Sequence, residues 1–262
     1  MTKRLIAVYA LLLSGFAANA QNWAGGVDDE ALHFGFMFQY ISSEYKILKK
    51  TDWRNPYPNP DIPGKYITDS LNSIYSKSAT GFGLGFVVNF RLGENADIRF
   101  TPGLSFADRM LYYEYPNSGG PHTDPGVPEP NTYVSLEENP LTKKVPSTMV
   151  DFPLGLKIKS NRLMNFRAYF LTGIKYSTDI VSKKKLDDSG NDWLEKYVKN
   201  QRHILSYEVG VGFDLYFEFF KMTPELKFSQ SINSVLKPED QPFSKPLDKL
   251  FLRNIQFSLF FE

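Results

Sequence analysis

Apolar side chains recur at every second position in several segments of this chain. Leu32, Phe34, Phe36, Phe38 and Tyr40 follow this pattern, and the residues at 82, 84, 86, 88 and 90 repeat it. A period of two places successive side chains on opposite faces of a β-strand. The pattern returns about eight times, with glycine, polar or charged residues between the apolar ones. It therefore predicts an all-β protein whose strands have one apolar and one polar face.

Eight strands are predicted, and the connections between them alternate in length. We expect strands at 31–42, 79–91, 97–107, 148–160, 166–178, 204–217, 222–231 and 247–261. Short connections at 92–96, 161–165 and 218–221 alternate strictly with long ones at 43–78, 116–147, 179–203 and 232–246. Outer-membrane barrels have this layout, with short periplasmic turns and long outer loops. The prediction is an eight-stranded antiparallel up-and-down transmembrane β-barrel over residues 31–262, with apolar side chains toward lipid and polar ones in the lumen.

Two features interrupt the third and fourth predicted strands. Pro102 and Pro153 fall inside them, and a proline cannot donate a hydrogen bond to a neighbouring strand. The alternation of the third strand breaks near Asp108, which predicts a β-bulge, and the strand can extend beyond it to residue 115.

The first twenty residues have the pattern of a signal peptide. Lys3 and Arg4 precede an apolar stretch at 5–16, and small residues at 18–20 form a cleavage site. An uncleaved anchor is the alternative, but the apolar stretch is short for a membrane span. We expect a cleaved signal peptide at 1–20, a periplasmic linker at 21–30 and an integral outer-membrane location. The mean hydropathy of −0.32 argues against a helical membrane protein but not against a barrel.

Composition excludes several classes of function. The chain has 30 basic and 29 acidic residues, so it lacks the basic surplus of a nucleic-acid-binding protein. It has no cysteine, which excludes disulfides and thiolate chemistry. Metal binding by His122 and Asp124, or calcium binding in the oxygen-rich segment 187–192, lacks the usual ligand number or spacing. No metal or cofactor is predicted.

Charged residues lie at positions that are predicted to face the lumen. They are six cations and five anions: Arg91, Asp97, Arg99, Asp151, Lys157, Arg167, Lys175, Glu208, Asp214, Glu225 and Lys227. The interior of an eight-stranded barrel is just wide enough for side chains to fill it. Because unpaired buried charges are costly, we expect these groups to pair and close the barrel. A proton or solute path is the alternative.

Enzymatic activity is not expected. His203 and Ser206 lie near the outer end of one strand, where a lipid-modifying barrel enzyme would hold its catalytic groups. However, the chain has no Gly-x-Ser-x-Gly motif and no cluster of His, Asp and Ser.

The second half of the chain, mainly residues 148–262, resembles the PorT family of Bacteroidota outer-membrane barrels. The matching segments are 150–157, 159–162, 165–169, 173–176, 208–212 with Asp214, 224–229 and 257–262. The resemblance implies a non-enzymatic component of the type IX secretion and gliding apparatus, which exports proteins with a C-terminal sorting domain. The family offers no catalytic residues to transfer to this chain. A stand-alone structural or adhesion barrel is the alternative function, and a diffusion pore is a further one.

The expected partners are outer-membrane lipid, lipopolysaccharide and other proteins of the secretion machinery. Lys183–Lys185 could contact lipopolysaccharide. Aromatic residues are enriched at binding surfaces, and those assigned to the long loops are candidates for protein contacts: Trp53, Tyr57, Tyr112, Tyr113, Trp193 and Tyr197.

Overall fold

The computed structural model describes residues 31–116, 139–180, 188 and 190–262. The predicted signal peptide and linker, His122, Asp124 and Lys183–Lys185 lie outside these residues. The strands are β1 (Leu32–Lys49), β2 (Ser73–Lys77), β3 (Ala79–Arg91), β4 (Ala96–Phe100), β5 (Gly103–Phe106), β6 (Arg109–Glu114), β7 (Leu141–Val145), β8 (Thr148–Lys159), β9 (Phe166–Asp179), β10 (His203–Tyr216), β11 (Lys221–Ser231) and β12 (Leu247–Phe261). A short 3-10 turn, η3, spans Trp193–Glu195. No helix in the described ranges has the length and hydropathy of a membrane span.

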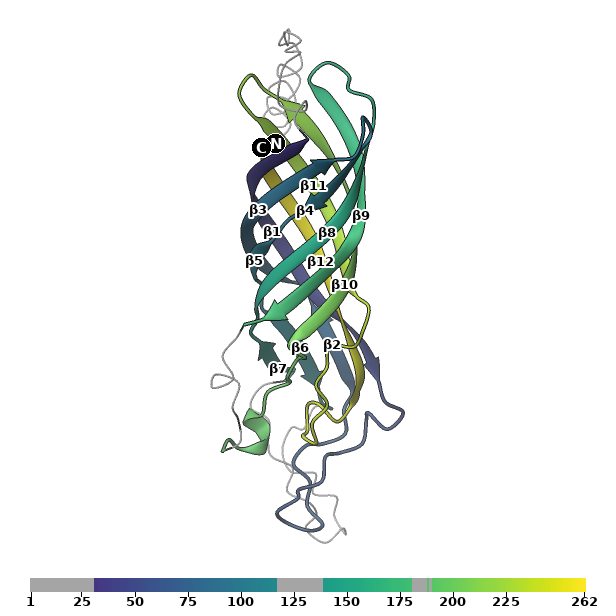
Figure 1. The fold of residues 1–262 in the computed structure, drawn as a ribbon. Helices are drawn as coiled ribbons and strands as arrows, with labels where there is room; N and C mark the ends of the chain where they lie inside the picture. The colour runs from purple at the N-terminus through teal and green to yellow at the C-terminus, as the bar shows by residue number, and fades with distance from the viewer. Residues whose placement is uncertain (1–30, 117–138, 181–187, 189) are drawn as a thin grey trace, which may run out of the picture.

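The main sheet closes into a ring (Figure 1). Its order is β1-β12-β11-β10-β9-β8-β4-β3, β5 continues the position of β4, and antiparallel pairing of β1 with β3 completes the ring. Since β4 and β5 share one position, the ring has eight strand positions, and the predicted fold class is confirmed. A closed ring leaves no unpaired strand edge, which is the condition for β-structure in lipid.

The two faces of the ring have the predicted polarity. Phe34 and Phe86 point outward and are 65% and 69% exposed, whereas Lys157 and Asp214 point inward and are fully buried. Outward aromatic rings pair across strands, as in the stacked Phe36–Phe261 pair with ring centroids 5.3 Å apart. In water this arrangement would expose an apolar surface far larger than a monomer tolerates, so the outer face requires lipid.

The two prolines lie beside each other at one interruption of the ladder. Phe100 pairs with Leu154 and Gly103 pairs with Asp151, so Pro102 and Pro153 fall between these pairs on neighbouring strands. Their carbonyl groups still accept bonds, at 2.9 Å from the Phe86 amide and 3.2 Å from the Thr101 amide. The missing donors of these two prolines therefore lie at one place, where β4 ends and β5 begins.

The prediction for the long loops needs correction. The segment 43–78 contains the end of β1 and all of β2, while β6 follows the barrel strand and β7 lies inside the predicted loop 116–147. The strands β2, β6 and β7 form a separate three-stranded sheet at the end of the barrel opposite the short turns (Figure 1). The break near Asp108 is not a bulge but the point where the chain passes from the ring into this outer sheet. The polarity is reversed here, because inward Ile74, Leu111 and Val145 are apolar and buried.

An apolar core fills the outer end of the barrel, and we call it the outer cap. Its buried members come from the outer sheet, the ends of the barrel strands and the loops: Tyr45, Leu71, Ile74, Leu111, Tyr113, Tyr115, Val145, Met149, Val198, Ile204, Val235, Leu236, Phe243, Leu247, Leu250 and Leu252. The connection 232–246 contributes Phe243, which is fully buried and packs edge-on against Tyr113 at 5.3 Å. The Tyr113 hydroxyl donates to the Phe243 carbonyl at 2.6 Å. Lys143 lies 4.1 Å above the Phe243 ring, and burial lowers the pKa of this lysine to about 8.

We predict that Phe243→Ala unfolds the outer cap without opening the ring. Loss of a fully buried phenylalanine costs about 3–5 kcal/mol. Trp53 packs against the cap core, so its fluorescence during urea unfolding in detergent micelles reports this loss. The matched control is Phe219→Ala, because Phe219 is 86% exposed; its effect should stay within about 0.5 kcal/mol. Equal effects of the two substitutions would contradict the role assigned to Phe243.

Candidate functional site

Ion pairs cross the lumen at the level of the membrane-spanning strands. Arg99 of β4 is central, since its Nη1 lies 2.9 Å from Glu225 of β11 and its Nη2 lies 3.5 Å from Glu262. The Arg99 Nε donates to the Asn89 side chain at 2.8 Å. Its guanidinium carbon also lies 4.7 Å from the centroid of the Phe260 ring. One arginine therefore links the walls formed by β3, β4, β11 and the end of β12.

A second pair joins β8 to β10. The Lys157 ammonium group lies 2.7 Å from Asp214, and Thr223 of β11 donates to the same carboxylate at 2.7 Å. The ammonium group also lies 4.1 Å from the centroid of the Tyr169 ring. Lys157 and Asp214 are both fully buried. The partners lie on strands that both pair with β9, so the bond crosses the inner face of β9.

Of the predicted lumen residues, most are brought into contact with an opposite charge. Glu208 lies 3.4 Å from Lys175 and 3.3 Å from Lys227. Asp97 pairs with Lys159 at 2.6 Å, although Lys159 was not among the predicted residues.

The other three predicted lumen residues have hydrogen bonds to hydroxyl or backbone groups. Asp151 accepts bonds from Ser105 at 2.7 Å and Ser177 at 2.5 Å. Arg91 and Arg167 lie at the rim near the short turns, where each donates to a backbone carbonyl, that of Gly93 at 3.3 Å and that of Ser160 at 2.7 Å. These two arginines therefore close the rim rather than fill the centre.

Among the described residues, the sequence reasoning missed the charged lumen residues Lys159, Lys221 and Glu262, and also inward Arg109, which is 2% exposed and donates to Ser43 at 3.2 Å. Lys159 has the same strand phase as Lys157, so the alternation itself could have identified it. Lys221 was assigned to a turn but begins β11, and its ammonium group lies 3.0 Å from Glu262. Glu262 lies one residue beyond β12 in the phase of Phe260, with its side chain buried in the lumen.

The loop aromatics divide into buried and accessible residues. Tyr113 is fully buried in the outer cap, and Tyr57 is 5% exposed and donates to the Asp240 carbonyl at 3.0 Å. Burial and the Asp240 carboxylate raise the pKa of Tyr57 to about 12. Neither ring offers a face to a protein partner, so these two residues have a structural role. For the others a binding role stays a prediction: Trp53, Tyr112, Trp193 and Tyr197.

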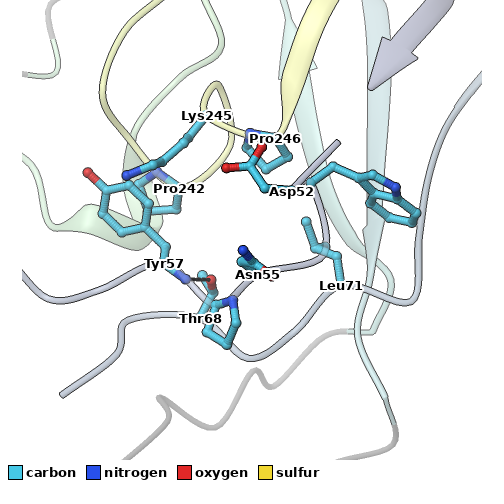
Figure 2. Close-up of a pocket in the computed structure, with 10 residues that line it drawn as sticks. Asp52, Asn55, Tyr57, Thr68, Leu71, Pro242, Lys245 and Pro246 are labelled. Atoms are coloured by element: carbon cyan, nitrogen blue, oxygen red, sulfur yellow. Dashed lines mark hydrogen bonds between the residues drawn. The ribbon is translucent and has the colours of Figure 1, made fainter. Parts of the chain in front are cut away.

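A small pocket opens between the segment 52–71 and the connection 232–246 (Figure 2). The side chains of Asp52, Asn55, Tyr57 and Lys245 surround it, and prolines complete the wall. Its volume of about 30 Å³ holds only a few water molecules. The pocket is therefore too small to enclose a substrate.

The residues considered for catalysis are not assembled into a site. His203 is exposed on the outer face of β10, where its Nδ1 lies 2.8 Å from the Tyr176 hydroxyl. Ser206 faces the lumen and is 2% exposed. The two side chains lie on opposite faces of the strand, so they cannot act on one substrate. Within the described ranges, no group of three potential metal ligands lies together.

The turns at the other end of the barrel expose apolar side chains that the sequence reasoning overlooked. Leu163 and Met164 at the β8–β9 turn are 73% and 67% exposed, and Phe219 at the β10–β11 turn is 86% exposed. Figure 1 shows both turns projecting beyond the rest of the ring. Arg162 and Tyr216 connect them, with the guanidinium carbon 3.9 Å from the ring centroid. We call Leu163, Met164 and Phe219 the apolar tips.

The backbone at Met164 is strained. Its φ of +54° is in the left-handed region, which side chains other than glycine, asparagine and aspartate rarely adopt. Exposed Ser160 and Asn161 separate this turn from Ile158, the last lipid-facing residue of β8. The tips therefore lie at the end of the apolar band, next to the exposed aromatic residues Phe166, Phe217 and Phe220.

Comparison with known proteins places the chain among outer-membrane barrels. A family model described as outer membrane protein beta-barrel domain matches residues 19–237. No curated protein matches the sequence. Similar solved structures include OprG from Pseudomonas aeruginosa (13% identity, 88% of this chain and 93% of that chain covered, TM-score 0.41). Neisserial surface protein A (6%, 88% and 98%, 0.39) and Ail of Yersinia pestis (12%, 87% and 96%, 0.35) are others. The family model covers most of the chain and carries the assignment.

We predict that Lys157→Met destabilises the barrel by about 3–5 kcal/mol, because it removes one partner of a buried pair. The double variant Lys157→Met/Asp214→Asn should recover part of this loss, since it leaves no uncompensated carboxylate. Urea unfolding in micelles measures both. The control is Lys144→Met, which removes an exposed pair with Asp108 and should cost about 0–1 kcal/mol. Additive losses in the double variant would show that the two groups do not interact.

Proposed function

Since the chain belongs to the outer membrane protein β-barrel domain family, we propose that it is a non-enzymatic outer-membrane subunit that supports type IX protein secretion. In this role it binds another protein of the secretion apparatus at its periplasmic end, through the apolar tips. It reaches the membrane by export with a cleaved signal peptide.

The filled interior supports a role other than transport. The lumen is occupied by fully buried pairs such as Lys157–Asp214, and the outer cap closes its outer end. A solute would have to break these pairs and displace apolar side chains. The function of this barrel is therefore binding at its outer surfaces and not transport through its lumen.

The exposure of the apolar tips is the observation that carries the proposal. Exposed Leu163, Met164 and Phe219 lie where short turns of a barrel face the periplasm. A strained residue that presents an apolar side chain to water is costly unless the site is used. A protein partner with an apolar surface would cover these side chains, and the resemblance to the PorT family indicates that the partner belongs to the secretion machinery.

We predict that polar substitution of the tips blocks secretion and leaves the barrel folded. Leu163→Ser/Met164→Asn/Phe219→Ser keeps a residue type at 164 that tolerates positive φ. In a strain that lacks the native gene, this variant should trap proteins with C-terminal sorting domains in the periplasm, as deletion itself is expected to do. Proteomics of periplasm and medium measures the trapping, and heat-modifiable gel mobility checks folding.

The matched control is Ile62→Ser, which removes an apolar side chain that is 46% exposed at the outer end. Secretion should be normal in this control. Normal secretion in the tip variant would disprove the docking role of the tips. If deletion also leaves secretion intact but alters adhesion of the cells, the chain is a stand-alone adhesion barrel.

A second prediction concerns conduction. The purified barrel in planar lipid bilayers should give no current steps, because its lumen is filled along the membrane-spanning strands. A porin inserted under the same conditions shows that incorporation works. Reproducible ohmic current steps from the wild-type protein would contradict a closed lumen.

A further inference from the structure

The outward face of the β2–β6–β7 sheet carries a cluster of tyrosine and lysine side chains. Cross-strand pairing places Lys77, Met110 and Lys144 in one row, and Tyr75, Tyr112 and Thr142 in the next. We name these six residues the tyrosine–lysine face. We propose that this face binds the phosphorylated sugar headgroup of an outer-leaflet glycolipid.

The face stands directly above the lipid-facing band. The last outward aromatic pair of the band on these strands is Phe82–Phe106, with ring centroids 5.1 Å apart. Beyond it, β3 presents Thr80 outward, and exposed Lys77 is the last residue of β2, which precedes β3 in the chain. Tyrosine and lysine are typical of the headgroup level, where an amphipathic ring and a long basic side chain meet both apolar and polar lipid groups.

The two tyrosines form a flat platform with a cation beside it. The Tyr75 and Tyr112 rings stack with centroids 5.1 Å apart and an angle of 7° between their planes. The Lys77 ammonium group lies 5.6 Å and 5.1 Å from the two centroids, and among the described residues no carboxylate forms an ion pair with it. Lys77 therefore has a fixed position and a charge that is still available to an anion. A sugar ring can pack on the tyrosines while its phosphate meets the lysine.

The charge of the surrounding surface favours an anion. Lys144 is 57% exposed although it pairs with Asp108 at 2.6 Å. Exposed Lys46 lies on neighbouring β1, next to Tyr45, whose amide is bound by Ser76 of β2 at 3.1 Å. Two further carboxylates lie nearby: Glu44 is 4.0 Å from Arg253, and Glu114 accepts a hydrogen bond from Ser73 at 2.7 Å and keeps its charge. Among these described groups, the four basic residues Lys46, Lys77, Lys144 and Arg253 exceed the three carboxylates by one positive charge.

The test is binding of diphosphorylated lipid A to the full chain in neutral detergent, followed by native mass spectrometry. Lys77→Ala/Lys144→Ala should weaken binding roughly 30-fold, the loss expected when two basic residues leave an anionic lipid surface. Dephosphorylated lipid A should bind wild-type protein and variant equally weakly. Inorganic phosphate in millimolar excess should not displace the lipid, because the sugar contacts are absent.

The matched control is Lys237→Ala/Lys245→Ala at the far end of the outer region. Lys237 is 59% exposed and pairs with Glu239 at 3.2 Å, as Lys144 pairs with Asp108, and Lys245 lies 5.0 Å from a tyrosine ring, as Lys77 does. Lipid binding should be unchanged in this control. Unchanged binding in the first variant, equal losses in both variants, equal binding of dephosphorylated lipid, or displacement by phosphate would each overturn the proposal. None of these outcomes depends on whether the apolar tips support secretion.

Discussion

The pairing of charges inside a closed ring is the constraint on which this structure depends. Lipid offers no partners to backbone groups, so the strands must close, and closure at eight strand positions leaves a lumen that side chains fill. The polar faces of the strands are then enclosed together with their charges. Arg99 meets Glu225, Glu262 and Asn89 at one point, so residues from both halves of the chain must be in register before the centre is neutralised. Strand order and electrostatics therefore depend on each other.

Side chains alternate between the two faces of a strand both within and above the membrane, but the face that carries the apolar side chains is reversed between the two regions. Along the membrane most apolar residues of the strands face outward, and the lumen is polar apart from a small buried cluster of Met37, Val87 and Phe260. Above it, Leu111 and Tyr113 of β6 face inward and are fully buried, while Tyr112 faces outward. Water replaces lipid as the surroundings at this height, so the apolar set moves to the inside. The surroundings of the wall thus decide what fills the inside: a polar lumen network where lipid lies outside, and the apolar outer cap where water lies outside.

The fold was predictable from local pattern because a period of two survives in every membrane-spanning strand. Lumen residues such as Lys157 and Asp214 followed from phase alone, and Lys159 could have. Glu262 and Lys221 could not, since their assignment depends on where a strand ends, which is decided by long-range pairing. The outer strands β2 and β7 were hidden by their five-residue length and inverted phase. Burial of Phe243 depends on how the connection 232–246 folds onto the outer cap, and the sequence of this connection has no periodic pattern that would predict it.

A closed interior also separates the two ends of the molecule. The outer cap is tied by bonds between distant segments, such as that from Tyr113 to the Phe243 carbonyl, and the lumen network below it is paired rather than open. Among the described residues, the paired charges of the lumen and the outer cap therefore lie between the apolar tips and the outer sheet. Each end can be altered without the other, provided that the paired layer between them stays intact. The barrel wall thus holds the apolar tips and the outer sheet at the two opposite ends of the molecule.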